Sequence, residues 1–92
     1  MISERALIRR REEVHSAKVD EEVVMFDAED GAYFALGVHG SRIWELLEEP
    51  RTLEELCASL QEEYDVEPER CLADVSGFVE ELAESQLVDF AG

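Results

Sequence analysis

With 92 residues, the chain has room for a single domain with a modest core and little room for a deep catalytic cavity beside it. Its composition, 46% hydrophobic and 35% charged, is that of a folded globular protein and not of a disordered tail. No apolar run approaches the length of a transmembrane helix, and the basic N-terminus lacks the apolar stretch of a secretory signal. We therefore expect one cytoplasmic domain over residues 1–92, without membrane association.

Acidic residues dominate the charge, with 24 against 8 basic residues and a formal net charge of −16. The charge is uneven: residues 1–18 hold five basic and three acidic side chains, and residues 19–92 hold three basic and 21 acidic ones. Such a surface repels phosphate backbones, which argues against nucleic acid as a partner. Two interpretations remain open, solubility alone or steering toward a basic peptide or protein.

The first third of the chain has strand-like patterns. Residues 23–26 are β-branched and aromatic, and residues 14–19 and 32–36 flank them as further candidate strands. The segment Asp27 to Gly31 carries the Asp-Gly pair of a tight hairpin, with Gly31 free to adopt a positive φ. We expect a three-stranded antiparallel meander.

Helical periodicity begins after Gly37 and Gly40 and predicts three helices. The first has a short apolar face over residues 43–47 and ends at Pro50. Thr52 and Glu55 form a capping box that opens the second, and Pro68 suits the first turn of a third helix that runs to about Ser85. Residues 87–90 then form a short final strand or a docked tail.

This order predicts an α+β fold of winged helix-turn-helix type, a three-stranded antiparallel sheet followed by three helices. Gly77 lies inside the third helix, where glycine costs roughly 1 kcal/mol relative to alanine. We interpret it as a place where another group approaches the backbone closely.

No pattern in the sequence indicates catalysis, a metal or a cofactor. His15 and His39 are 24 residues apart, without a cysteine, histidine or aspartate at metal-ligand spacing. Cys57 and Cys71 lie in apolar helical patterns and are expected to be buried free thiols. No serine lies in a nucleophile elbow, and adjacent carboxylate pairs point about 100° apart on a helix, as solvated faces do.

The third helix would be the recognition helix of a DNA-binding domain, but its charge opposes that role. It carries one arginine, Arg70, among five acidic residues: Glu69, Asp74, Glu80, Glu81 and Glu84. Its apolar residues fall in two stripes, one of Cys71, Val75, Phe78 and Leu82 and one of Leu72, Val79 and Ala83. One stripe faces the core; the other either lines a groove beside an exposed strand or is buried as part of a wide core face.

Several fragments, in this order and spacing, resemble the PqqD-like family of RiPP recognition elements, which serve pathways that make ribosomally synthesised, modified peptides. The resemblance spans residues 14–90. Its fragments are Phe26-Asp27, Gly31 to Leu36, Gly40 to Leu47, Thr52 to Leu56, Tyr64 to Arg70, Asp74-Val75, Phe78-Val79, Leu82 and Leu87-Val88.

The resemblance implies that the domain binds the leader segment of a precursor peptide by strand addition and catalyses nothing itself. The implied peptide-binding residues are Ala32, Tyr33, Phe34, Ala35 and Leu36 in the third strand, and Cys71, Asp74, Val75, Phe78 and Leu82 in the third helix. A Val75→Glu variant is expected to stay folded and to lose binding.

The implied partners are the leader and a separate maturation enzyme. That enzyme is a leader peptidase in lasso-peptide maturation or, alternatively, a radical enzyme of the PQQ pathway. A third alternative is an acidic adaptor that binds another folded protein.

Overall fold

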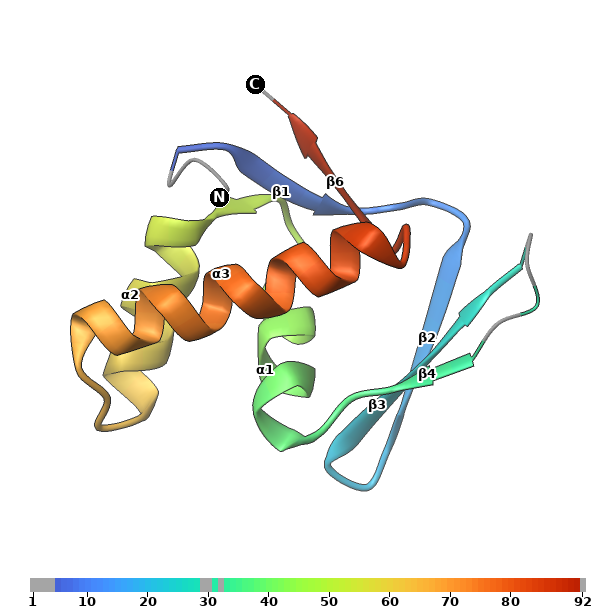
Figure 1. Ribbon diagram of the computed structural model, residues 1–92. Helices are drawn as coiled ribbons and strands as arrows, with labels where there is room; N and C mark the ends of the chain where they lie inside the picture. The colour runs from blue at the N-terminus through green and yellow to red at the C-terminus, as the bar shows by residue number, and fades with distance from the viewer. Residues whose placement is uncertain (1–4, 29–30, 32, 92) are drawn as a thin grey trace.

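The computed structural model describes residues 5–28, 31 and 33–91. Within these residues the chain forms three helices and six strands (Figure 1). In chain order they are β1 (Leu7–Arg10), β2 (Val14–Val19), β3 (Glu22–Asp27), β4 (Tyr33–Ala35), α1 (Val38–Leu46), β5 (Arg51–Thr52), α2 (Leu53–Glu63), α3 (Pro68–Glu84) and β6 (Val88–Ala91). None of these helices is long and apolar enough to span a lipid bilayer.

The strands form two separate antiparallel sheets, in the orders β5-β1-β6 and β2-β3-β4. The second sheet is the predicted meander, with Met25 of β3 opposite both Ser16 of β2 and Phe34 of β4. Gly31 has a φ of 70°, as predicted, and its N–H bonds the Asp27 carbonyl at 2.8 Å. The first sheet joins chain segments far apart in sequence, since β1 pairs with β6 along its full length.

Side-chain alternation in β3 explains how the meander packs. Val23 and Met25 are buried toward the helices, and Val24 and Phe26 alternate with them on the opposite face, where they are only half-buried. Since paired residues share a face, Phe34 lies on the same face as Met25. The ring of Tyr33 lies 5.0 Å from that of Phe26 on the outer face. One face of this sheet therefore packs against the core and the other faces solvent.

Local sequence signals set the helix starts. Thr52 and Glu55 form the predicted capping box: the threonine hydroxyl accepts from the Glu55 N–H, and the Glu55 carboxylate accepts from the Thr52 N–H. Pro68 occupies the first turn of α3, as predicted. Cys57 and Cys71 are buried, also as predicted.

The N-terminal half of α1 is held to the β2-β3-β4 sheet by one buried hydroxyl. Ser41 is 1% exposed, and its Oγ accepts from the Val23 N–H at 2.7 Å and donates to the Leu36 carbonyl at 3.1 Å. The hydroxyl thus sits between two backbone groups that face each other at the end of the β3–β4 ladder. It fixes where the first helix starts relative to β4.

The C-terminal end of α1 is held by two arginines from the other sheet. Arg10 of β1 donates to the Trp44 carbonyl, and Arg51 of β5 donates to the Leu46 carbonyl. Guanidinium groups at this end bind carbonyls of the last turn and complement the negative end of the helix dipole. Arg10 also lies over the Trp44 ring, 4.5 Å from its centroid, and burial lowers the pKa of this arginine.

The α+β class and the order of a meander followed by three helices are confirmed, but the winged-helix description is not. The β5-β1-β6 sheet was not predicted; of residues 87–90, expected to form a short strand or a docked tail, residues 88–90 lie in β6 and Leu87 precedes it. The segment Leu7–Arg10 has too little alternation to predict a strand, and only pairing with β6, almost 80 residues away, makes it one. The first helix also starts earlier than its apolar face, at Val38.

Ser41→Ala should lower the free energy of unfolding by about 1–3 kcal/mol, because it leaves the Val23 N–H and the Leu36 carbonyl without their shared partner in the core. Urea unfolding followed by circular dichroism measures the change. Ser16→Ala, at an exposed position of β2, is the control and should change stability by less than about 0.5 kcal/mol. Equal stability of Ser41→Ala and the parent would contradict the role assigned to the hydroxyl.

Candidate functional site

A groove of about 580 Å³ opens between the start of α1, the end of α2 and the first half of α3. Three core side chains, Ile43, Leu60 and Val75, form its base, and the rings of Tyr64 and Phe78 are half-buried in its walls. The remaining lining residues are Gly37, His39, Gly40, Asp65, Val66, Glu67, Arg70, Cys71 and Asp74. The groove is therefore apolar at its base and polar at its mouth, as peptide-binding grooves are.

Gly40 allows α1 and α3 to approach closely beside this groove. A Cβ built on Gly40 would lie 2.9 Å from Cζ of Phe78 and 3.6 Å from the Leu36 Cβ. The aromatic ring of α3 and the residue that follows β4 thus meet at the same glycine. This contact places the end of β4 next to the floor of the groove.

The outer edge of β4 is open to pairing. β4 is the last strand of its sheet, and the Leu36 N–H bonds the Val23 carbonyl at 2.9 Å. Since antiparallel pairs alternate, Phe34 also directs its N–H and carbonyl toward β3, and Tyr33 and Ala35 direct theirs away. Backbone groups of these two residues are available to an added strand.

The mouth of the groove is acidic. Asp65, Glu67 and Asp74 line it, all three exposed, and Arg70 is the cation among the lining residues. Arg70 lies 3.7 Å from Asp74, with both side chains more than 70% exposed, so this ion pair is weak.

Two interactions link α1 to the end of α2 next to the groove. The ring of His39 packs edge-on against that of Tyr64, with centroids 5.1 Å apart. Arg42 binds both carboxylate oxygens of Glu63, each at 2.7 Å. Hydrogen bonding from Arg42 lowers the pKa of Glu63, and the same bonds raise the pKa of Arg42.

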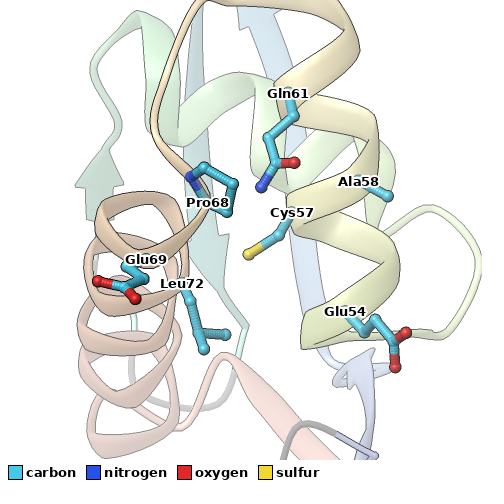
Figure 2. A pocket seen from close by; sticks show the side chains of 7 residues that line it. All are labelled: Glu54, Cys57, Ala58, Gln61, Pro68, Glu69 and Leu72. Atoms are coloured by element: carbon cyan, nitrogen blue, oxygen red, sulfur yellow. The ribbon is translucent and has the colours of Figure 1, made fainter.

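A second, smaller hollow of about 320 Å³ lies on the other side of α3, between that helix and α2. Figure 2 shows its lining, with the sulfur of Cys57 directed between the two helices toward Pro68 and Leu72. Glu54 and Glu69 stand at its rim. Its lining residues all come from α2 and α3, whereas the larger groove lies next to the end of β4.

Within residues 5–28, 31 and 33–91, no three His, Cys, Asp or Glu side chains are grouped so as to hold a metal ion. The open edge of β4 lies next to a groove with an apolar base and a charged mouth, and these are the elements of peptide recognition by strand addition.

A family model described as coenzyme PQQ synthesis protein D (PqqD) matches residues 22–88. The chain belongs to the PqqD family. This confirms the resemblance noted in the sequence. No match was found among curated protein sequences.

Two solved structures resemble the chain over nearly its whole length. The first, TbiB1 in complex with the TbiA(beta) leader peptide, is 36% identical, has a TM-score of 0.85, and is matched over 91% of this chain and 98% of that chain. The second, lasso peptide synthetase B1 complexed with the leader peptide, is 26% identical, has a TM-score of 0.78, and is matched over 89% of this chain and 96% of that chain.

The structure places four of the ten predicted site residues of this PqqD-family domain in the lining of the groove, and others in or next to β4. Cys71, Asp74, Val75 and Phe78 all line the groove, and Leu36 meets Phe78 at Gly40. Tyr33 and Ala35 lie at the free strand edge, with side chains on the outer face of the sheet, and the Phe34 side chain lies on the inner face. Ala32 lies outside the described residues. Leu82 is buried farther along α3 and does not line the groove.

The two stripes of α3 do not divide into a core stripe and a groove stripe. Cys71 and Val75 are core residues and groove residues at once, and Val79 of the other stripe is fully buried. Val75 is 3% exposed, so Val75→Glu would bury an unpaired carboxylate and destabilise the domain. The burial of Val75 argues against the expectation that this variant stays folded, so milder substitutions must test the groove.

Sequence reasoning missed the contributions of α1 and α2 to the groove. Residues such as Ile43, Leu60 and Tyr64 read only as helical core positions, and nothing in their spacing marks them as lining a groove. The glycine prediction was also misplaced: a Cβ on Gly77 would meet nothing within 4 Å, and the close approach occurs at Gly40 instead. The sequence did contain a signal for the close approach: Gly40 lies near the start of the first helix, where Gly37 and not Gly40 is the cap.

Glu63→Gln should lower stability by about 0.5 kcal/mol or less at pH 7, because this ion pair is a third exposed. The folded-state pKa of Glu63 lies below its ordinary value of 4.5, so its contribution is full above that value and is lost as the pH falls through the folded pKa. Urea unfolding of parent and variant at pH 7 and about pH 3 should show the difference shrinking in acid. Glu62→Gln serves as the exposed control, and a difference that grows in acid would contradict this assignment.

Proposed function

We propose that this domain binds the leader segment of a ribosomally made precursor peptide and presents it to a separate processing enzyme. The observation that carries the proposal is the open edge of β4 beside the α3 groove. It is supported by likeness over about nine tenths of the chain to two domains whose structures were solved with leader peptides. The domain itself acts as a non-catalytic partner in the cytoplasm, where precursor peptides are made.

The leader adds to β4 as a fourth strand of the β2-β3-β4 sheet. Tyr33 and Ala35 supply the main-chain hydrogen bonds, which give affinity without regard to sequence. Every second leader side chain then points to the inner face, toward Phe78 and the base of the groove. An apolar leader side chain packed there provides the selectivity.

We propose a leader peptidase of lasso-peptide maturation as the partner enzyme. Both similar structures are B1 proteins bound to a leader peptide, and the second is named as a lasso peptide synthetase component. The description of the family model favours a second candidate, presentation of a precursor to an enzyme of PQQ synthesis. The two candidates share the binding step and differ in the enzyme that follows. Fluorescence anisotropy with a labelled leader from each class of precursor separates them.

Phe78→Ala should weaken binding of the labelled leader about thirtyfold or more, because an aromatic anchor in a desolvated groove often contributes about 2 kcal/mol. Leu72→Ala is the matched control: Leu72 is also half-buried on α3 but lines the second hollow. Both variants lose stability, and circular dichroism identifies the temperature at which both are folded. Equal affinities of the two variants at that temperature would place the peptide elsewhere.

Ala35→Pro should also abolish binding and leave the sheet intact, because the Ala35 N–H faces the open edge and not β3. Ser16→Pro is the control, since the Ser16 N–H points to the opposite open edge, that of β2. Anisotropy titrations of both variants compare the two edges. Loss of binding in Ser16→Pro alone would mean that the leader pairs with β2.

A further inference from the structure

We infer that the acidic mouth of the groove selects leaders with a lysine or arginine at the end of the segment that pairs with β4. This inference rests on the proposed function and adds the chemical class of residue that the site requires. It concerns the part of the groove that lies past the last residue of β4, where strand pairing ends and the groove continues between α1, α2 and α3.

The position of the groove separates it from the strand edge. Of its lining residues, Gly37, His39 and Gly40 follow β4, and the others come from helices or from the connection between α2 and α3. A leader that pairs with Tyr33 and Ala35 therefore reaches the mouth with residues that no longer form ladder hydrogen bonds. Side-chain chemistry alone determines what binds there.

The charge of the groove mouth determines which leader side chain can bind there. The lining holds three carboxylates, those of Asp65, Glu67 and Asp74, and one guanidinium, that of Arg70. The ion pair of Arg70 with Asp74 is long and exposed, so it neutralises little of this charge. A ligand with an anionic group is repelled here, and a cationic side chain gains up to three partners.

The apolar surface between these carboxylates suits the stem of a long basic side chain. Val66 is 41% exposed at the mouth, and the rings of Tyr64 and His39, which pack edge to face, line the same groove. Lysine and arginine bury their alkyl stems on such surfaces while the charged head stays at the rim. An arginine head can also stack on the exposed part of an aromatic ring.

The test uses a displayed library of random peptides of about ten residues, long enough for a paired strand and a flanking segment. Binders are selected with three proteins. One is the parent, one is the groove variant Asp65→Asn/Glu67→Gln/Asp74→Asn, and one is the control variant Glu54→Gln/Glu69→Gln/Glu81→Gln. Each triple variant changes the net charge equally, from −16 to −13, at exposed positions. The control positions lie outside the groove, two of them at the rim of the second hollow (Figure 2).

The parent and the control should enrich peptides with lysine or arginine at one fixed distance from an apolar residue, and the groove variant should enrich the apolar residue alone. Selected peptides should bind the groove variant about tenfold more weakly than the control at low salt, with the gap narrowing at high salt. Enrichment of apolar peptides without a basic residue, or equal loss in both triple variants, would overturn the inference and leave the proposed function standing. Failure of every protein to enrich any peptide would overturn the proposed function as well.

Discussion

The position of α1 is the constraint on which the rest of the structure depends. Its first turn is tied to the β2-β3-β4 sheet through the Ser41 hydroxyl, and its last turn is tied to the other sheet through Arg10 and Arg51. The two sheets share no strand, so this short helix couples them. It also presents Gly40 to Phe78 and so sets the spacing between β4 and α3.

A groove built in this way uses core residues as its base. Val75, Leu60 and Ile43 are nearly fully buried and still line it, so the surface offered to a peptide is part of the folded core. Little rearrangement is then needed on binding, which limits the entropic cost of association. The same overlap means that mutations at the base change stability and affinity together, so only exposed positions report on binding alone.

Much of this arrangement is readable from local sequence signals. The capping box at Thr52, the proline at the start of α3 and the positive φ of Gly31 are each specified within a few residues, and the structure has all three. The β1 strand and the two arginines over the end of α1 are set by contacts between distant segments, for which a single sequence carries no local signal.

The residues of the site also fall into those that the sequence could predict and those that it could not. Positions on one helix face, such as Cys71, Val75 and Phe78, could be grouped by spacing and by family resemblance. The parts of the groove from α1 and α2 could not, because their periodicity is the same whether a residue packs inside a core or lines a depression in it. Leu82 is a residue that spacing also grouped with the site: it lies in the same stripe as Val75 but does not line the groove.

The open edge of β4 has a consequence for the solubility of the domain. An edge that accepts any extended backbone accepts the edge of another copy as readily as a peptide, which is how sheets aggregate. β4 has only three residues, and each copy carries a net charge of −16, so two copies repel at the distance where strands would pair. The net negative charge thus opposes edge-to-edge pairing of two copies, and this repulsion weakens as salt screens the charge.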